Sequence, residues 1–201
     1  MTKSQPTQPH ASRRNFLKSS AAASVAANMV TQAASAAARS SDDKVVVGIM
    51  GVSRGSALAQ QFATVTGVEV RYICDIDSKR LATFQESFSK TVDYEVKTVG
   101  DFRKMLDDPE LDVLVCAAPN HWHAPASILA CAAGKHVYVE KPCSHNAREG
   151  ELLIEAARNN KRCVQMGNQR RSGEEIMEAM ALLHEGRIGN VYYSRSWYAA
   201  N

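Results

Sequence analysis

The sequence predicts an α/β fold built on a doubly wound parallel sheet, and three features indicate it. Between residues 44 and 166, short apolar runs alternate with amphipathic stretches of helical period, which is the pattern of consecutive βαβ units. The first run leads through a glycine-rich turn, Gly48–Gly55, into a helical stretch. A later run ends at Glu140-Lys141-Pro142. Because ligands of open α/β sheets bind beyond the carboxyl ends of the strands, this charged pair marks the expected reactive centre.

Each element follows from its local pattern. The expected strands, short apolar runs bounded by turn residues, are Val45–Met50, Val68–Cys74, Glu95–Val99, Val113–Ala117, His136–Val139 and Arg162–Met166. The expected helices are Ser56–Thr64, Lys79–Ser89, Asp101–Leu106, Ala124–Ala133, a helix capped by Ser144 or Asn146 that runs to about Asn159, and Glu174–Glu185. Asp77 or Ser78 is expected to cap the second helix, and Gly134 to end the fourth. Right-handed crossovers then give the doubly wound sheet.

Residues 167–201 have a different character. The aromatic segment Val191–Tyr198 is expected to open a strand of another sheet. An aromatic strand edge without a partner favours aggregation. We therefore expect residues 44–166 to form one domain and residues 167–201 to be the truncated start of a second, α+β domain in a longer protein.

The first forty residues contain five basic residues and no acid, and without them the net charge falls from +3 to −2. The basic balance therefore gives no reason to expect nucleic acid as a partner. Ser12–Lys18 resembles a twin-arginine export signal, and the following run, Ala21–Ala38, is too polar for a stable membrane anchor. We expect residues 1–38 to be a signal peptide and the protein to be periplasmic or otherwise extracytoplasmic. A disordered Ala/Ser-rich tail is the alternative.

The cysteines and histidines do not predict a metal site. The five cysteines include no CxxC pair, which argues against a structural zinc site and against a disulfide framework. His121 and His123 lie one residue apart, but the sequence offers no evident third ligand. We therefore expect no metal.

The turn after the first strand is expected to bind a pyrophosphate. Glycines at such a turn let backbone N–H groups approach the anion, and the dipole of the following helix favours negative charge. The match is incomplete, because Ser53 stands at the second glycine position and Gly55 arrives one residue early. A plain strand-to-helix turn is the alternative. The candidate contacts are Gly48, Gly51, Ser53, Arg54 and Gly55.

An acid at the end of the second strand favours a dinucleotide. Asp75 lies 24 residues after Gly51, close to the roughly 20 expected of the carboxylate that binds the adenosine ribose. A carboxylate there repels a 2′-phosphate, so NAD is favoured over NADP, while Lys79 and Arg80 keep NADP open. The alternative for Asp75 is a simple turn residue.

Together these motifs resemble the Gfo/Idh/MocA oxidoreductases, named for glucose–fructose oxidoreductase and inositol dehydrogenase. The resemblance is carried by the first turn, Cys74-Asp75, Ala118-Pro119-Asn120-His121-Trp122-His123 and Gly134–Pro142, while Gln165–Ser172 is similar to an exported branch of that family. It implies a Rossmann-type NAD(P)-binding domain followed by the start of a substrate domain. The shortened glycine turn is the main departure from the family's pattern.

The resemblance also implies site residues. Pro119, Asn120 and His123 would line the cofactor near its ribose and nicotinamide. Glu140 would contact the nicotinamide side and orient Lys141, whose ammonium group would touch the substrate hydroxyl and stabilise a developing alkoxide. An exposed Glu140–Lys141 ion pair in a turn is the alternative.

Three polar residues after the last strand are expected to reach the substrate. Gln169, Arg170 and Arg171 follow that strand directly, and the planar donor fork of arginine suits a sugar oxygen or a carboxylate. Solvated arginines are the alternative.

The sequence thus predicts a nicotinamide-dependent oxidoreductase that moves a hydride to or from a sugar, polyol or related hydroxyl compound. One alternative is a glycosidase that oxidises a sugar transiently and then restores the hydride, and another is a non-catalytic nucleotide-binding module. The expected cofactor is NAD, with NADP possible. The expected partners are a sugar-like small molecule and, at full length, further copies of the chain, with neither nucleic acid nor a stable membrane anchor.

Overall fold

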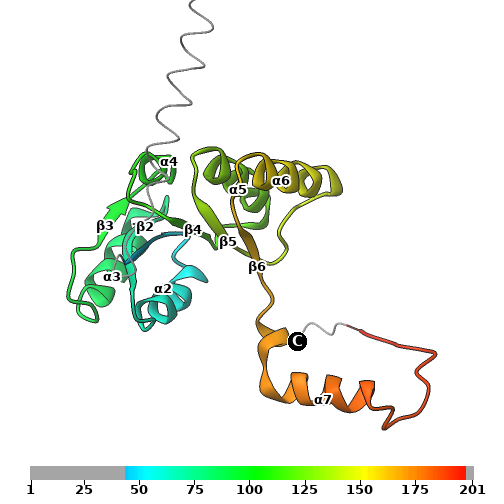
Figure 1. The fold of residues 1–201 in the computed structure, drawn as a ribbon. Coiled ribbons are helices and arrows are strands. Elements are labelled where there is room, and N and C mark those ends of the chain that lie inside the picture. The colour runs from blue at the N-terminus through cyan, green and yellow to red at the C-terminus, as the bar shows by residue number, and fades with distance from the viewer. Residues whose placement is uncertain (1–43, 198–201) are drawn as a thin grey trace, which may run out of the picture.

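The computed structural model describes residues 44–197, and a six-stranded parallel sheet forms its core (Figure 1). The strands are β1 (Val45–Met50), β2 (Val68–Cys74), β3 (Lys97–Val99), β4 (Val113–Cys116), β5 (His136–Glu140) and β6 (Val164–Gly167). Their spatial order is β3-β2-β1-β4-β5-β6. The chain winds from the centre to one edge, returns to the centre and winds to the other edge, which confirms the predicted doubly wound sheet. The predicted signal peptide, residues 1–38, lies outside the described residues.

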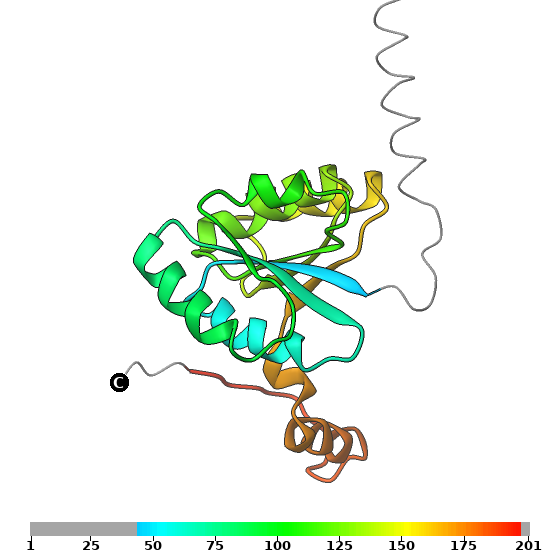
Figure 2. The same ribbon diagram turned by 90° about the vertical axis from the view of Figure 1, so that its left-hand side faces the viewer.

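Helices cover both faces of the sheet. They are α2 (Gly55–Ala63), α3 (Ser78–Phe88), α4 (Arg103–Leu106), α5 (His123–Ala132), α6 (Ala147–Asn159) and α7 (Glu174–His184), with short 3-10 helices at Asn120–Trp122 and Gln169–Ser172. Figures 1 and 2 show α2 and α3 on one face and α4, α5 and α6 on the other, while α7 stands apart beyond β6. No helix within residues 44–197 is both long enough and apolar enough to cross a membrane.

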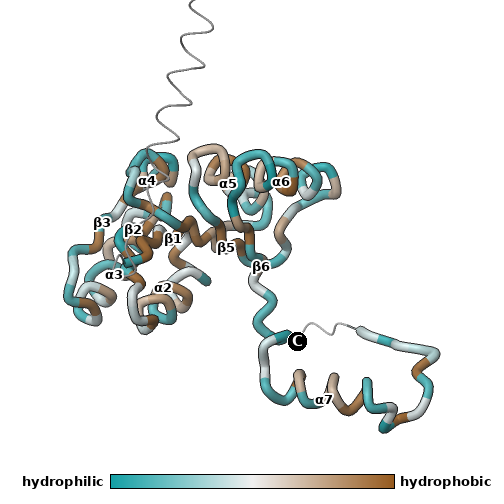
Figure 3. The backbone as a smooth tube through the Cα atoms, viewed as in Figure 1, coloured by the Kyte–Doolittle hydropathy of each residue, from teal (hydrophilic) through white to brown (hydrophobic). Residues whose placement is uncertain are grey.

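The central strand β1 supplies apolar side chains to both layers. Val47 and Ile49 belong to the core under α2 and α3, whereas Val46 and Met50 belong to the core under α4, α5 and α6. Successive side chains of a strand point to opposite faces, so a strand buried on both sides must be apolar throughout. Figure 3 shows the resulting hydrophobic band along the strands between the two helical layers.

The predicted helix boundaries rest on local hydrogen bonds. Asp77 caps α3 by accepting the N–H of Lys79, and Asn146 caps α6 by accepting the N–H of Glu149. Gly134, which follows α5, has a φ of 79°, the left-handed conformation that glycine adopts without a steric penalty. These three predictions are confirmed.

The predicted strand at Val191–Tyr198 is wrong for the residues that the structure describes. Residues 191–197 form no strand, and Tyr192 and Trp197 are 97% and 80% exposed. A strand needs a neighbour to accept its backbone hydrogen bonds, and this segment pairs with none of the six strands. The aromatic composition of the segment was therefore insufficient evidence for a strand.

A β-bulge interrupts β2 at a charged residue. Val70 pairs with Val47 and Tyr72 pairs with Gly48, so Arg71 is the extra residue between the two pairs. The bulge changes which side chains of β2 share a face. Val70 faces α2 and α3, whereas Tyr72 faces the opposite layer.

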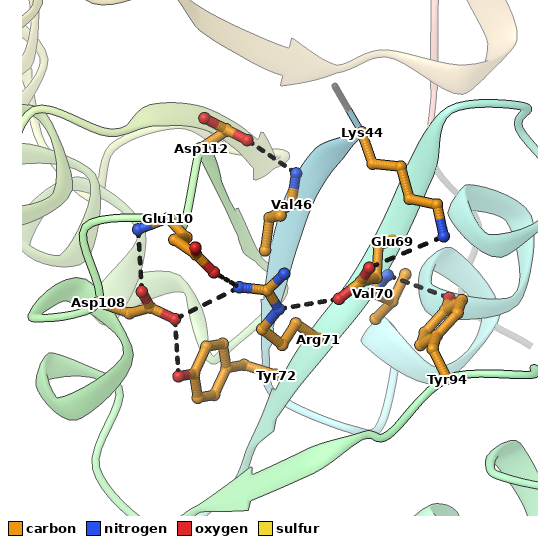
Figure 4. Close-up of polar contacts among 10 residues, drawn as sticks. All are labelled: Lys44, Val46, Glu69, Val70, Arg71, Tyr72, Tyr94, Asp108, Glu110 and Asp112. Atoms are coloured by element: carbon orange, nitrogen blue, oxygen red, sulfur yellow. Dashed lines mark hydrogen bonds and ion pairs between the residues drawn. The ribbon is translucent and has the colours of Figure 1, made fainter. Parts of the chain in front are cut away.

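The guanidinium of Arg71 joins β2 to the loop before β4 (Figure 4). Its Nε donates to Glu69 at 2.8 Å, and its Nη1 donates to Glu110 and lies 3.8 Å from Asp108. The Tyr72 hydroxyl donates to Asp108 at 2.9 Å. Partial burial disfavours the charged form of Asp108, yet the Glu110 N–H, the Tyr72 hydroxyl and Arg71 together hold its pKa below the ordinary value. Arg71 therefore neutralises carboxylates that partial burial has brought together.

Replacing Arg71 with Met is expected to lower the free energy of unfolding by about 2–4 kcal/mol, because the carboxylates of Glu69 and Asp108, only 16% and 17% exposed, lose their counter-charge. Urea unfolding measures the loss. The control is Arg148→Met, which removes an ion pair to Glu151 in which both side chains are more than 60% exposed and which should change stability by at most about 1 kcal/mol. Equal losses in the two variants would contradict the account of Arg71.

Candidate cofactor and active site

A cavity of about 690 Å³ opens at the carboxyl ends of β1, β2 and β4. This is where the winding of the sheet reverses, which is the position that binds ligands in open α/β sheets. The cavity is lined by Met50, Gly51, Cys74, Asp75, Ile76, Gly100, Asp101, Phe102, Arg103, Ala118, Pro119, His121, Trp122 and Leu129. Of the predicted cofactor residues, the structure brings Gly51, Asp75 and Pro119 together there.

Gly51 forms the floor of the turn after β1. Its φ is +91°, and a Cβ atom at this position would lie 2.8 Å from the carbonyl oxygen of Ala117 and 2.9 Å from the backbone nitrogen of Ala118. Its N–H donates to the carbonyl of Cys74 at 2.8 Å. Only glycine allows the backbones at the ends of β1, β2 and β4 to approach so closely.

Two other glycines of the turn region have packing roles. A Cβ on Gly55 would lie 2.8 Å from Cγ2 of Ile49, so this glycine lets α2 pack tightly on the sheet. A Cβ on Gly48 would lie 2.9 Å from the sulfur of Met105. Gly48 is buried within β1 rather than at its end, and the structure places this predicted cofactor residue away from the cavity. Ser53 and Arg54 are exposed in the turn between β1 and α2.

The carboxylate of Asp75 is oriented by the backbone. One oxygen accepts the N–H of Val52 at 2.9 Å, and the other accepts the N–H of Asp77 at 2.9 Å. Each carboxylate oxygen has a second lone pair, so Asp75 can still accept ribose hydroxyls from a ligand in the cavity. The sequence did not predict the contact to Val52, which ties the acid to the glycine turn.

Two buried thiols lie beneath the cavity. Burial, with smaller contributions from Asp75 and Asp101, raises the pKa of Cys74 to about 12, and burial raises the pKa of Cys116 to about 11. Both thiols stay protonated near neutral pH and act as small apolar groups rather than as nucleophiles.

The His123 side chain lies between two segments of the backbone. Its side chain is buried, with Nδ1 2.6 Å from the carbonyl oxygen of Pro142 and Nε2 2.7 Å from that of Ala118. The ring therefore joins the loop after β4 to the turn after β5. Both ring nitrogens lie within hydrogen-bonding distance of backbone carbonyl oxygens, and His123 does not line the cavity, although the sequence predicts a cofactor contact for it. Asn120 is exposed and begins the 3-10 helix next to the cavity.

Glu140 is the centre of a second polar cluster. Only 5% exposed, it accepts hydrogen bonds from Nε of Arg54 at 3.0 Å and from Nε2 of Gln169 at 2.7 Å. Burial disfavours its charged form, but the hydrogen bonds from Arg54 and Gln169 prevail and lower the pKa of Glu140 below its ordinary value. Gln169, a predicted substrate residue, thus holds Glu140. Glu140 pairs with Arg54, and the side chain of Lys141 is exposed.

The remaining predicted residues lie around this cluster. Lys141 follows β5 directly, and its backbone N–H lies 3.3 Å from the second oxygen of Glu140. Arg170 and Arg171 are exposed in the 3-10 helix after β6. The carboxyl ends of β5 and β6 therefore carry the polar groups expected of a substrate site.

Several cavity residues were missed by the sequence reasoning. Ile76, Trp122 and Leu129 are apolar, exposed and line the cavity, and Asp101 and Arg103 enter it from the end of β3. Most of them shared one signal, their position after a strand or at the start of the next helix, whereas Leu129 lies within α5.

Comparison with known proteins identifies the domain. Residues 43–168 match the model of the Gfo/Idh/MocA family, described as an oxidoreductase family with an NAD-binding Rossmann fold. The chain belongs to this family. The fit is physical as well, because the Gly51 turn, the Asp75 carboxylate and an apolar cavity form the site that a dinucleotide requires. The residues present therefore fit the NAD-binding Rossmann fold that the family description gives.

Individual relatives agree with this assignment. The chain is 32% identical over 145 residues to inositol 2-dehydrogenase of Salmonella typhimurium, covering 71% of this chain and 42% of that protein. It is 31% identical over 169 residues to a glycosyl hydrolase family 109 protein of Shewanella baltica, covering 78% and 35%. The chain thus spans well under half the length of these curated relatives.

Solved structures show the same fold. Myo-inositol 2-dehydrogenase from Lactobacillus plantarum has a TM-score of 0.67 at 23% identity, covering 74% of this chain and 43% of that one. The WlbA dehydrogenase from Bordetella pertussis, solved with NADH and UDP-GlcNAcA, has a TM-score of 0.63 at 22% identity, covering 74% and 44%.

Replacing Gly51 with Ala is expected to cost about 1–3 kcal/mol more than replacing Gly67 with Ala. Both glycines have positive φ, at +91° and +80°, but a Cβ on Gly67 meets nothing within 4 Å. The difference between the two losses in urea unfolding isolates the contact with Ala117. Gly51→Ala should also weaken NADH binding, whereas Gly67→Ala should not. Equal losses with unchanged binding would contradict this reading of the turn.

Removing Arg54 is expected to destabilise the protein in a pH-dependent way. The pKa of Glu140 is lower in the folded protein than its ordinary value. The ion pair with Arg54 therefore stabilises the fold fully at a pH above the ordinary carboxyl pKa. This stabilisation is lost as the pH falls through the folded-state pKa. Arg54→Met should therefore lower the free energy of unfolding by about 1–3 kcal/mol at pH 7, with a gap to wild type that shrinks below about pH 4.5. Arg80→Met, at an exposed and weak pair with Asp77, is the control. A gap independent of pH would refute the assignment.

Proposed function

We propose that the complete protein is an NAD-dependent oxidoreductase that moves a hydride to or from a sugar, polyol or related hydroxyl compound. The observation that carries the proposal is the position of Lys141. It follows β5 directly, on the same edge of the sheet as the cofactor cavity, in a domain of the NAD-binding oxidoreductase family. A cation at this edge can contact a substrate that lies next to the nicotinamide.

The chain's own residues have distinct tasks in this reaction. Bound NAD supplies the hydride acceptor or donor. Asp75 accepts hydrogen bonds from the adenosine ribose, and the turn at Gly51 receives the pyrophosphate. Pro119 and Asn120 border the ribose and nicotinamide end.

Lys141 contacts the substrate hydroxyl. Its ammonium group would donate a hydrogen bond to the hydroxyl oxygen and stabilise the alkoxide character that develops when the carbon loses hydride, while the hydroxyl proton passes to solvent. Glu140 does not form the turn's exposed ion pair with this lysine, because its carboxylate is buried and held by Arg54 and Gln169. The anchored carboxylate fixes the backbone from which Lys141 extends.

The surrounding region completes the proposal. Arg170 and Arg171, with Gln169 beside them, border the substrate, and residues 167–201 begin the substrate domain of a longer protein. We also propose that residues 1–38 direct export through the twin-arginine route and that the complete protein is a homo-oligomer. Cell fractionation and light scattering on the complete protein test these two points.

A second candidate function is supported by the similarity to the glycosyl hydrolase family 109 protein of Shewanella baltica. The hydride would then return to the sugar after bond cleavage, so that NADH does not accumulate. Incubating the complete protein with a panel of nitrophenyl glycosides separates the two functions. Release of nitrophenol without NADH supports the second candidate, whereas NADH formation from free polyols or sugars supports the first.

Replacing Lys141 with Ala is expected to lower turnover by about a hundredfold or more, since the group that stabilises the alkoxide is lost. NADH affinity should stay within about threefold, because the cofactor cavity is not lined by this residue. The assay follows NADH absorbance with the complete protein and a panel of polyols and sugars. Lys90→Ala, which removes an exposed lysine paired with Glu86, is the control. Unchanged activity and unchanged substrate affinity in Lys141→Ala would refute the role.

A further inference from the structure

One arginine that lines the cavity, Arg103, is hydrogen-bonded to a neighbouring carboxylate, that of Asp101. The guanidinium of Arg103 donates from Nε to both oxygens of Asp101, at 3.0 and 3.1 Å, and from Nη2 to Oδ2 at 2.6 Å. The backbone N–H of Arg103 also donates to Asp101 at 3.0 Å. A planar guanidinium bound edge-on to a carboxylate in this way is a directional pair, and the side chains of Arg103 and Asp101 are 71% and 35% exposed.

Both partners lie at the adenosine end of the cavity. Strand β3 pairs with β2, so the residues after Val99 emerge beside Asp75, whose N–H donates to the Val99 carbonyl at 3.3 Å. Asp75, Asp101 and Arg103 line one cavity. Asp75 and Asp101 both act on the Cys74 thiol, where they add to the effect of burial in raising its pKa. The two carboxylates therefore border the same cavity, after the neighbouring strands β2 and β3.

The charges at this end disfavour a phosphate. Among the residues that line the cavity, Arg103 is the one arginine or lysine. NADP differs from NAD by a phosphate on the adenosine ribose, which adds roughly 1.5 to 2 negative charges near pH 7. In dinucleotide sites an arginine near the ribose accommodates this group. Here that arginine is neutralised by Asp101, and Asp75 adds a further negative charge.

We propose that Asp101 is a cofactor-specificity residue, which selects NAD over NADP by holding Arg103 away from the ribose 2′-phosphate. The inference rests on the proposed NAD-dependent function and adds a residue from the end of β3 to the discrimination expected of Asp75. Lys79 and Arg80 do not line the cavity, and Arg80 faces Asp77 at 4.0 Å.

The test titrates NADH and NADPH separately into the purified chain by calorimetry. Asp101→Asn keeps the side-chain oxygen that accepts the Arg103 N–H but removes the charge that holds the guanidinium. NADPH affinity should rise about tenfold or more, since a repulsive charge is lost and a cation is released. NADH affinity should change less than about threefold. Because the gain is electrostatic, it should fall when the salt concentration is raised from 0.05 to about 1 M.

Two further variants show which residue acts. Arg103→Gln alone should leave the weak NADPH binding of the wild type unchanged, and Asp101→Asn with Arg103→Gln should lose most of the gain. Asp101→Ser, which also caps a helix start, replaces Asp101→Asn if the latter unfolds in a thermal scan.

Each contrary result has a defined meaning. An unchanged NADPH to NADH affinity ratio in Asp101→Asn, or an equal gain with and without Arg103, overturns the inference about Asp101. Wild-type binding of NADPH as tight as that of NADH overturns it too, while leaving a dinucleotide-dependent function intact. A wild-type chain that binds neither cofactor overturns the proposed function and this inference together.

Discussion

The backbone contact at Gly51 is the constraint on which the rest of the site depends. Its N–H binds the end of β2 through the carbonyl of Cys74, and its Cα lies against the end of β4 at Ala117. Three strands of the sheet therefore end at one point, without a side chain between them. The cavity opens where the winding reverses, and Asp75 is held at its edge by the next N–H of the same turn, that of Val52. One residue without a Cβ thus sets the position of both the turn after β1 and the Asp75 carboxylate.

The position of Lys141 depends on the same region through its neighbours. Glu140 precedes Lys141 and is held by Arg54, which stands immediately before the first residue of α2. Pro142 follows Lys141, and its carbonyl meets the buried ring of His123 from the loop after β4. The residues on both sides of Lys141 are therefore anchored by segments next to the cavity, while its own side chain stays exposed.

Sequence patterns were sufficient for the features that depend on local chemistry. Apolar runs located the six strands, and the caps at Asp77 and Asn146 needed only the side chain and the next turn of backbone. Gly51 and Asp75 could be proposed because their roles follow from spacing along the chain.

The contacts between distant segments could not be derived in this way. Neither the bulge at Arg71 nor the hold of Arg54 on Glu140, which lies 86 residues away, leaves a periodic signal. Val191–Tyr198 shows the reverse error, because the segment is rich in aromatic residues but residues 191–197 have no strand to pair with in the described part of the chain.

The most direct test of the account is a crystal structure of the chain with NAD. The account predicts adenosine in the cavity with a ribose hydroxyl on the Asp75 carboxylate, the pyrophosphate over the Gly51 turn, and the nicotinamide ring within reach of Nζ of Lys141. A dinucleotide bound elsewhere on the domain, or a nicotinamide ring beyond the reach of that lysine, would contradict it.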